Sequence, residues 1–436
     1  MNQVINLFPH QRSALEATDG RNRVAYYLDM GLGKTLLGSE KMRELGASVN
    51  LVICQKSKIQ DWIDHFKKYY GLEQETFDLT NKKAFELFLE EIEKDYPAKF
   101  SQRYVGVINY ELAWRRKELL ELKDFTLMLD ESSLIQNRKA KQSKFILKLN
   151  PANVILLSGT PCSGKYENLW TQIHLLGWEI KEPLYNKQYV NWKTIEAGEF
   201  KHKIVDKENP YKNVERLKSK LRQYGAVFMK TEECFELPEQ NFIDVKVKSS
   251  KEYQRFMKHS IVTINDNELV GDTNLTKRLY ARMIVSQFNP NKINAFKDLI
   301  ESTNDRLIVF YNFTEELTQL VCIAEELNKP ISIINGKTKD LSAYENEDNS
   351  ITFVQYQAGA KGLNLQKSNK VIYFSPTEKC EDYMQSLKRV HRIGQNKPCF
   401  YYRLIASKTI DELIYKAVEE GVDFTDELFK EKEKNE

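Results

Sequence analysis

The chain has 436 residues, with 65 Lys or Arg, 62 Asp or Glu and a formal net charge of +3. A content of 41% hydrophobic and 29% charged residues excludes an intrinsically disordered chain and favours a globular protein of roughly two or three domains. A net charge this close to zero excludes a uniformly basic surface, so any nucleic-acid-binding face is expected to be a local patch.

Cysteine usage and hydropathy indicate the compartment. The six cysteines are scattered, and none is paired with another at C-x-x-C spacing, which argues against a zinc site or a disulfide scaffold. The first residues lack a basic segment followed by an apolar core, and no apolar run approaches the ~20 residues that cross a membrane. We therefore expect a cytoplasmic protein with no membrane partner.

The strongest local pattern is a glycine loop between a predicted strand and a predicted helix. Residues 24–28 form a short apolar run that favours a buried strand, and residues 36–45 favour a helix. Phosphate-binding loops require this strand–loop–helix order. The residues expected to surround the phosphates of a nucleotide are Met30, Gly31, Leu32, Gly33, Lys34 and Thr35.

The residue types in this loop fit a nucleoside triphosphate. Gly31 and Gly33 let backbone N–H groups turn toward phosphate oxygens, and the N-terminus of the following helix attracts the same anion. Lys34 is expected to neutralise the β- and γ-phosphates, and the Thr35 hydroxyl to bind Mg²⁺. Leu28 stands where such loops usually have their first glycine. The alternative is a glycine turn with a surface lysine, which the flanking strand and helix disfavour.

Four further apolar runs follow in the first half of the chain and predict strands at 49–54, 104–108, 125–129 and 154–157. Such runs suit a parallel sheet covered by helices on both faces, so the predicted fold class is α/β. The five strands end in polar clusters: the glycine loop, 55–57, 109–111, 130–133 and 158–161. Because ligands of open α/β sheets bind beyond the carboxyl ends of the strands, we expect all five clusters at one edge.

Two of these clusters carry further candidate residues. Asp130 and Glu131 directly follow a predicted buried strand, where Asp130 can hold Mg²⁺ and Glu131 can orient and deprotonate the attacking water. Ser158 and Thr160 follow the next strand, and we expect their hydroxyls to couple the state of the nucleotide to bound substrate. A plain turn is the alternative for residues 158–161.

The strand–helix alternation stops over residues 163–235, which are rich in Lys and aromatic residues. We interpret this region as a mainly helical insertion that does not continue the sheet; its basic residues could contact a phosphate backbone or form a solvated face. Residues 237–239 indicate a break into a second unit. After a helical stretch at 251–288, strands are predicted at 307–311, 331–334, 351–355, 371–374 and 400–405. The charged tail, 426–436, is expected to be a frayed helix end.

The second half also supplies a cluster of cations. Gln385, Arg389 and Arg392 have spacings of four and three, so on a helix they lie on one face. Phosphoryl transfer needs cationic stabilisation of charge, and an arginine supplied across a cleft provides it. We therefore predict catalytic roles for these three residues. The alternative is a basic helix that is solvated or bound to DNA.

Taken together, these motifs resemble the superfamily 2 helicase-type ATPases, and among them the Swi/Snf-related DNA translocases. The segments that carry the resemblance are DMGLGKT (29–35), DESSLIQN (130–137), LSGTP (157–161), AGAKGLNL (358–365), QSLKRVHRIGQ (385–395) and RLIASKTIDELIYKAV (403–418). Residues 9–11 are similar to the adenine-recognising segment of that group, with Gln11 as the base contact. Arg389 and Arg392 match its arginine positions, and Arg392 is the better finger candidate.

The resemblance implies two RecA-like lobes with ATP and Mg²⁺ between them and DNA across both. Lobe 1 is expected at 1–162 with the insertion 163–235 attached, and lobe 2 at 236–436, including a helical protrusion at about 250–290. By their positions in the matching motifs, the residues expected to face DNA are Lys56, Ser57, Asn109 and Tyr110 in lobe 1, and Asn312, Lys337, Gly359 and Lys361 in lobe 2.

Three departures from the family pattern are visible. Ser132 and Ser133 stand where Ala-His is frequent, which puts in doubt the lobe–lobe link usually made by that His. Ala360 replaces a common Gly in the fifth motif, and Lys388 replaces another before Arg389. None of these changes removes a charge that hydrolysis needs.

The resemblance implies an enzyme, a DNA-stimulated ATPase that moves along double-stranded DNA by opening and closing two lobes. A strand-annealing or fork-remodelling enzyme acting on forked or branched DNA is the related alternative, and a strand-separating helicase is less favoured because no wedge domain is evident. A DNA- or protein-binding regulator with a degenerate ATPase, and a nuclease-associated or restriction motor, belong to other classes. We expect a monomeric motor of bacterial or phage type, with any protein partner acting in DNA replication, recombination or repair.

Overall fold

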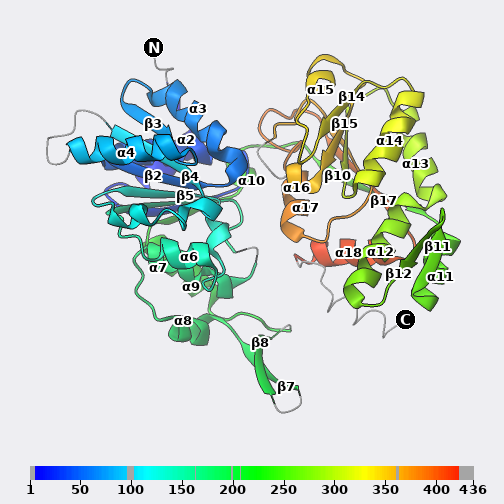
Figure 1. The fold of residues 1–436 in the computed structure, drawn as a ribbon, viewed down its shortest axis with the longest axis horizontal. Helices are drawn as coiled ribbons and strands as arrows, with labels where there is room; N and C mark the ends of the chain where they lie inside the picture. The colour runs from blue at the N-terminus through cyan, green and yellow to red at the C-terminus, as the bar shows by residue number, and fades with distance from the viewer. Residues whose placement is uncertain are drawn as a thin grey trace. The chain divides into compact units, whose positions relative to one another are not determined.

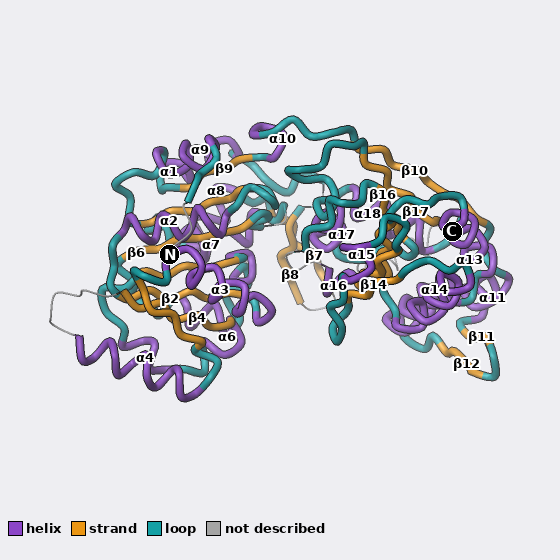
Figure 2. The backbone as a smooth tube through the Cα atoms, turned by 90° about the horizontal axis from the view of Figure 1, so that it is seen from above, coloured by secondary structure: helices purple, strands orange, loops and turns teal. Residues whose placement is uncertain are grey.

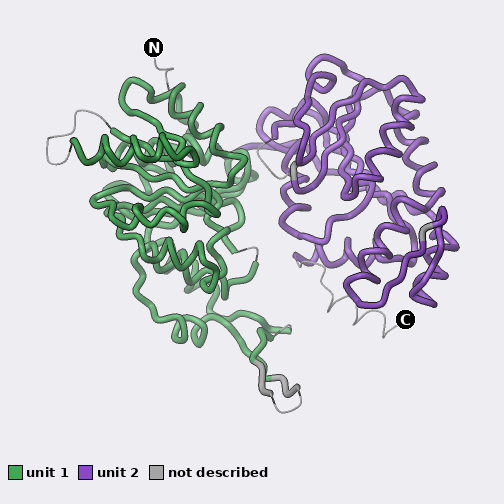
Figure 3. The backbone as a smooth tube through the Cα atoms, in the orientation of Figure 1, with its two compact units in different colours: residues 1–234 green, residues 235–436 purple. Residues whose placement is uncertain are grey.

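The computed structural model describes residues 5–95, 103–162, 164–197, 200–206, 208–359 and 363–421. The chain divides into two compact units, Met1–Cys234 and Phe235–Glu436, which Figure 3 shows in different colours. Each unit has a central layer of strands with helices packed around it (Figures 1 and 2). Within the described ranges, no helix is long and apolar enough to cross a membrane.

The first unit is built on a seven-stranded sheet, counted over the described residues, in which every strand pairing is parallel. The strand order is β3-β4-β2-β5-β6-β1-β9. The strands are β1 (Arg23–Leu28), β2 (Val49–Cys54), β3 (Gln74–Asp78), β4 (Arg103–Asn109), β5 (Thr126–Asp130), β6 (Asn153–Ser158) and β9 (Ala226–Met229), and a separate hairpin is formed by β7 (Trp192–Ala197) and β8 (Phe200–Val205).

Helices cover both faces of this sheet. They are α1 (Pro9–Glu16), α2 (Lys34–Leu45), α3 (Ile59–Tyr70), α4 (Lys82–Asp95), α5 (Tyr110–Ala113), α6 (Lys141–Ile146), α7 (Trp170–Leu175), α8 (Glu182–Tyr189), α9 (Val214–Gln223) and α10 (Thr231–Cys234), with short 3₁₀ turns at Lys56–Lys58, Lys117–Glu121, Ser132–Ile135 and Tyr166–Leu169. On one face, Gly38 of α2 packs directly against Met128 and Leu157. On the other, side chains of α4, α6, α7 and α9 share one core with alternate residues of the strands.

The predicted strands of this unit are confirmed, but two strands were missed. β3 is largely polar, and β9 lies inside the region that was interpreted as a helical insertion outside the sheet. That interpretation is wrong for residues 226–229, because β9 pairs with β1 and forms one edge of the sheet. The hairpin of β7 and β8 also shows that the region is not purely helical.

The second unit contains a six-stranded sheet among its described residues, again with only parallel pairings, in the order β10-β17-β16-β13-β15-β14. Its strands are β10 (Gln240–Val247), β13 (Leu307–Tyr311), β14 (Ile331–Ile334), β15 (Ile351–Gln355), β16 (Lys370–Tyr373) and β17 (Cys399–Ala406). The helices are α11 (Lys251–His259), α12 (Asn274–Gln287), α13 (Pro290–Glu301), α14 (Thr314–Glu326), α15 (Ser342–Asn346), α16 (Tyr356–Gly359), α17 (Cys380–Leu387) and α18 (Ile410–Glu419). The predicted α/β class with two parallel sheets is therefore confirmed.

Two apolar cores lie on opposite faces of this second sheet. One joins α11, α12, α17 and α18 to the sheet, and the other joins α13 and α14 to it. The stretch 251–288 was expected to be helical, but β11 (Ile261–Ile264) and β12 (Asn267–Val270) form a hairpin between α11 and α12. Asn265 and Asp266 both have positive φ, which is the backbone that a two-residue hairpin turn requires. The tail 426–436 lies outside the described residues.

A histidine links the packing of α2 and α3 in the first unit. His65 of α3 is in contact with the rings of Trp62 and Tyr70, and its Nε2 lies 3.0 Å from the Ser39 hydroxyl of α2. Burial, with a smaller contribution from the charge of Lys68, lowers the pKa of His65 to about 4. The folded state therefore holds this imidazole neutral at pH values where the unfolded chain protonates it.

The lowered pKa of His65 predicts how the stability of the first unit depends on pH. Between pH ~6.5 and 4 the unfolded state binds more protons at His65 than the folded state does, so stability falls as the pH falls, by up to roughly 3 kcal/mol. His65→Phe keeps an aromatic ring but removes the titration, and should lose less stability over the same range. Urea unfolding followed by tryptophan fluorescence measures this unit, because all five tryptophans precede residue 235. The exposed His174→Phe is the control, and equal pH slopes for His65→Phe and the wild type would contradict the assignment.

Candidate active site

The glycine loop has the backbone that a phosphate site needs. Gly31 and Gly33 have φ of 90° and 71°, values that favour glycine, and α2 begins directly after Gly33. The Nζ of Lys34 donates hydrogen bonds to the Leu28 and Asp29 carbonyl oxygens, at 2.8 and 3.2 Å. The Lys34 amine is thereby held against the loop that precedes α2.

Gln11 clamps this loop from α1. Its Oε1 accepts a bond from the Phe8 N–H at 2.9 Å, and its Nε2 donates to the carbonyl oxygens of Leu32 and Gly33 at 3.4 and 3.2 Å. A side chain at position 33 would place its Cβ 2.3 Å from the Gln11 Nε2. Gln11 therefore supports the loop in this structure, and its contact with a base stays a prediction.

Asp130 is the last residue of β5, which β6 separates from β1 in the sheet, and Glu131 follows it directly. The indole Nε1 of Trp62 donates to the Asp130 Oδ2 at 2.9 Å, and the Tyr110 hydroxyl donates to the Asp130 carbonyl oxygen at 2.9 Å. Burial raises the pKa of Asp130, while the Trp62 bond and then the charge of Lys34 oppose that rise. Glu131 has a φ of 53°, a left-handed backbone that turns the chain sharply after the strand.

The Trp62 bond predicts an effect on the metal requirement. Trp62→Phe keeps the packing on Phe66 but removes the donor that orients the Asp130 carboxylate. If Asp130 binds Mg²⁺, the Mg²⁺ concentration for half-maximal ATP hydrolysis should rise by roughly 10-fold or more, since loss of a group that orients a ligand typically costs that much. The control is Trp178→Phe, because Trp178 stacks on Tyr224 in the core of the same unit. An unchanged Mg²⁺ dependence would contradict this role of Trp62.

The loop after β6 lies beside Glu131 and Lys34. Ser158 is buried, its hydroxyl donates to the Glu131 carboxylate at 3.5 Å, and it accepts from the Thr160 N–H at 3.2 Å. The Lys34 Nζ lies 3.5 Å from the position a Cβ would take on Gly159. The structure thus brings Lys34, Glu131 and Ser158 together at one edge of the sheet, as the strand pattern predicted.

These residues fit an ATP–Mg²⁺ complex in the chemistry of their donor groups. The glycine loop and the helix N-terminus offer backbone N–H groups to phosphate oxygens, and Lys34 offers an ammonium. The Thr35 side chain is exposed in the first turn of α2, and the Asp130 carboxylate lies at the end of β5. Hydroxyl and carboxylate oxygens are the ligands that Mg²⁺ prefers, so Thr35 and Asp130 would hold it.

The predicted DNA contacts of the first unit differ in exposure. Lys56 and Ser57 are exposed in a 3₁₀ turn after β2, where a phosphate backbone can reach them. Asn109 and Tyr110 are buried, and the Asn109 amide donates to Glu111 at 2.6 Å. In this structure the Tyr110 hydroxyl supports the Asp130 backbone, and DNA contacts by Asn109 and Tyr110 stay predictions.

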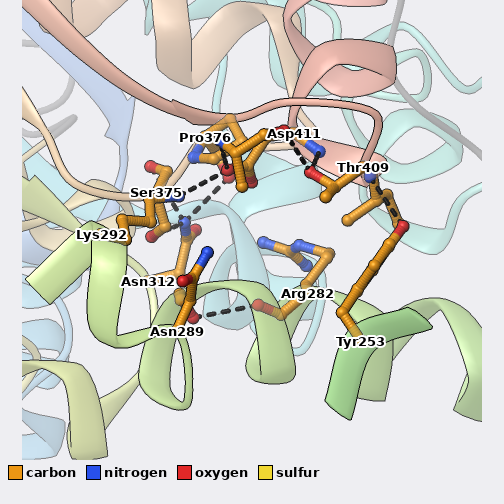
Figure 4. Close-up of polar contacts among 12 residues, drawn as sticks. Tyr253, Arg282, Asn289, Lys292, Asn312, Ser375, Pro376, Thr409 and Asp411 are labelled. Carbon is orange, nitrogen blue, oxygen red and sulfur yellow. Dashed lines mark hydrogen bonds and ion pairs between the residues drawn. The ribbon is translucent and has the colours of Figure 1, made fainter. Parts of the chain in front are cut away.

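Asn312, the first predicted DNA contact of the second unit, is engaged in an internal network (Figure 4). Its Nδ2 donates to the Ser375 hydroxyl at 2.8 Å and to the Pro376 carbonyl oxygen at 2.9 Å, and the Ser375 hydroxyl donates to the buried Glu316 carboxylate at 2.9 Å. This amide can bind DNA only by giving up those bonds. Lys337 is exposed after β14, Gly359 ends α16, and Lys361 lies outside the described residues.

The predicted helical face of Gln385, Arg389 and Arg392 is not present. α17 ends at Leu387, so only Gln385 is helical, and its amide donates to Glu381 at 3.1 Å. Beyond the helix the two arginines converge on one backbone oxygen: the Nη1 of Arg389 and the Nη1 of Arg392 donate to the Leu363 carbonyl at 3.4 and 3.3 Å. Burial lowers the pKa of Arg392. The arginines are therefore brought together by the loop after residue 362 and not by helical spacing.

Comparisons with known proteins identify the family of the chain. The SNF2-related domain matches residues 27–298, and the helicase conserved C-terminal domain matches residues 291–394. The chain belongs to the SNF2-related family. The predicted family and the helicase-type enzyme class are thereby confirmed.

Relatives of this SNF2-related chain are distant. The SWI/SNF-related matrix-associated actin-dependent regulator of chromatin subfamily A member 1 of Mus musculus is 23% identical, over 90% of this chain and 40% of that protein. An uncharacterized ATP-dependent helicase of Mycoplasma genitalium is 23% identical, over 95% of this chain and 41% of that protein. The SNF2-related chain thus spans about 40% of the length of these curated relatives.

Among solved structures, the Sulfolobus solfataricus SWI2/SNF2 ATPase core in complex with double-stranded DNA is similar, with 20% sequence identity and a TM-score of 0.45. The similarity covers 98% of this SNF2-related chain and 92% of the solved chain.

Two residues at the site were missed by sequence reasoning. Trp62 follows the predicted DNA-facing cluster at 55–57 by only five residues, but nothing in the sequence links its indole to Asp130. Gln172 lies in the region interpreted as an insertion, 40 positions after Ser132, whose hydroxyl donates to it. A glutamine in a short helix carries no pattern that could have predicted this contact.

Proposed function

We propose that this SNF2-related chain hydrolyses ATP in a cleft between its two lobes and uses the reaction to move along double-stranded DNA. The observation that carries the proposal is the convergence of Lys34, Asp130 and Glu131 at one sheet edge of the first unit. Each of the three groups has the chemistry that phosphoryl transfer needs. Family membership and the Mycoplasma relative, which is named an ATP-dependent helicase, support ATP as the nucleotide.

In this proposal, each site residue of the first unit has its own role in binding ATP or in its hydrolysis. Lys34 and the loop N–H groups bind and orient the phosphates, and the Glu131 carboxylate accepts a proton from the water that attacks the γ-phosphorus as the β–γ bridging bond breaks. Mg²⁺, when bound by Thr35 and Asp130, supplies charge neutralisation on the phosphate oxygens. Ser158 binds the Glu131 carboxylate and Thr160 donates its N–H to the Ser158 hydroxyl, and the two would report the state of the nucleotide to bound DNA.

The second unit would complete the site on closure of the lobes. Arg392, or Arg389 beside it, supplies positive charge to the γ-phosphate, and Gln385 contributes from the end of α17. Arg392 is the better candidate because Arg389 is buried, with only 3% of its surface exposed. Lys56, Ser57, Lys337, Gly359 and Lys361 remain our proposed contacts to the phosphate backbone of DNA.

The test is steady-state ATP hydrolysis without DNA and with single-stranded, duplex and forked DNA, at one fixed salt concentration because phosphate contacts are salt-sensitive. We expect plain duplex to stimulate hydrolysis, and a triplex-displacement assay on duplex DNA then measures translocation. Absence of turnover on every substrate would overturn the proposal and favour a DNA-binding regulator. Stimulation by forks or single strands alone would replace it with a strand-annealing or fork-remodelling enzyme.

A further inference from the structure

A buried glutamine joins the loops of the candidate active site. Gln172 of α7 has none of its surface exposed. Its Oε1 accepts hydrogen bonds from the Tyr27 hydroxyl at 3.0 Å and from the Ser132 hydroxyl at 2.7 Å. Its Nε2 donates to the Pro161 carbonyl oxygen at 2.6 Å. Both acceptor positions of the amide oxygen and one of its two N–H groups are therefore occupied.

The three partners come from three different strand ends. Tyr27 is the next-to-last residue of β1, which leads into the glycine loop. Ser132 directly follows Glu131, and Pro161 directly follows Thr160. Because the side chain is buried and its bonds are short, the amide fixes these three segments to one point of α7.

We infer that Gln172 is a positioning residue that sets the Glu131 loop and the 158–161 loop relative to the strand that carries the phosphate loop. The inference rests on the proposed ATPase function for its kinetic consequence, although the contacts themselves do not depend on it. Gln172 touches none of the reacting atoms. It acts through Ser132 and Pro161, the residues that adjoin Glu131 and Thr160.

The expected consequence is a loss of turnover with little loss of ATP binding. Misplacement of a catalytic group by about 1 Å can cost 100-fold, so Gln172→Leu should lower kcat by roughly 10- to 100-fold. The phosphate loop keeps its own contacts with Lys34 and Gln11, so the KM for ATP and the affinity for a fluorescent ATP analogue should change by less than about threefold. A merely structural role would instead lower the melting temperature and the fraction of folded enzyme, and kcat per active site, counted by titration with the fluorescent ATP analogue, would stay at its wild-type value.

Thr171→Val is the matched control. Thr171 is the neighbouring residue of the same helix, is equally buried, and has no hydrogen-bond partner for its hydroxyl among the described residues. It should leave kcat and KM at their wild-type values. Ser132→Ala removes one of the three bonds and should lower kcat by only a few-fold. Because Ser132 acts through Gln172, Ser132→Ala combined with Gln172→Leu should be no slower than Gln172→Leu alone.

Hydrogen exchange gives a readout that does not need turnover. In Gln172→Leu, backbone amides of residues 131–135 and 158–162 should exchange several-fold faster, while Thr171→Val should leave them unchanged. If Gln172→Leu does not fold, Tyr27→Phe combined with Ser132→Ala removes both donors to Oε1 and takes its place in each measurement. Unchanged exchange in these loops, or a kcat within twofold of the wild type, would overturn the inference. A wild-type protein without ATPase activity but with the expected exchange difference would overturn only the proposed function.

Discussion

Replacing Lys34 with alanine is expected to lower DNA-stimulated ATP hydrolysis by at least about 100-fold, because loss of one preorganised cationic donor to developing phosphate charge costs that much. The structure adds a second contribution, since burial raises the pKa of Asp130 and the charge of Lys34 opposes that rise, which favours the ionised carboxylate that Mg²⁺ needs. The measurement is kcat at saturating ATP and duplex DNA.

The control for this prediction is Lys82→Ala, which removes an exposed lysine from α4 of the same unit. It should retain wild-type turnover. Circular dichroism and tryptophan fluorescence must show that Lys34→Ala is folded, because its amine also bonds to the Leu28 and Asp29 carbonyl oxygens. A folded Lys34→Ala that kept half of the DNA-stimulated rate would rule out the proposed role of the loop.

The sheet strands that the sequence missed share one physical property, although the edge strand β14 was predicted from its apolar run. β3, β9 and β10 were missed, and all three are edge strands. An edge strand pairs on one side only and is partly solvated, so it does not need the continuous apolar run that identified β2 or β13. β10 shows this plainly, because the Phe242 and Ile243 side chains on it are exposed.

In the candidate site, the residues that the sequence predicted belong to local patterns, and the residues that it missed depend on long-range contacts. The glycine loop, Asp130 and Glu131 could be predicted because their function requires a fixed order of strand, loop and helix within a few residues. The helical face of Arg389 and Arg392 was wrong because spacing is informative only while the helix continues, and α17 ends at Leu387. Trp62 and Gln172 reach the site through contacts across 68 and 40 positions, which no local pattern encodes.

The second large effect is expected in the second unit, at a buried ion pair. The Nζ of Lys292 on α13 lies 2.5 Å from the Asp411 Oδ2 in the first turn of α18, and the two side chains are 0% and 3% exposed (Figure 4). Lys292→Met keeps most of the apolar volume but leaves the Asp411 carboxylate buried without its cation. Loss of one partner of a buried pair costs about 3–5 kcal/mol, so the second unit should be destabilised by that amount.

The sequence of the second unit contains no tryptophan, so its unfolding cannot be followed by tryptophan fluorescence and needs a local measurement. Hydrogen exchange of α13 and α18 under native conditions reports the opening free energy of this unit, with the helices of the first unit as the internal reference. Lys297→Met on the same helix, where the side chain is 43% exposed and pairs with Glu326, should cost less than about 1 kcal/mol.

A double-mutant cycle separates the ion pair from simple packing. Asp411→Asn keeps an oxygen that can accept the bond from the Ala406 N–H, now 3.1 Å from the carboxylate, but leaves the Lys292 ammonium buried and unpaired. The double variant Lys292→Met with Asp411→Asn removes both charges at once, so it should be less destabilised than the sum of the single variants by several kcal/mol. If the two effects were additive, the cost would come from lost packing at each site, and the pair would not be the interaction that joins α13 to α18.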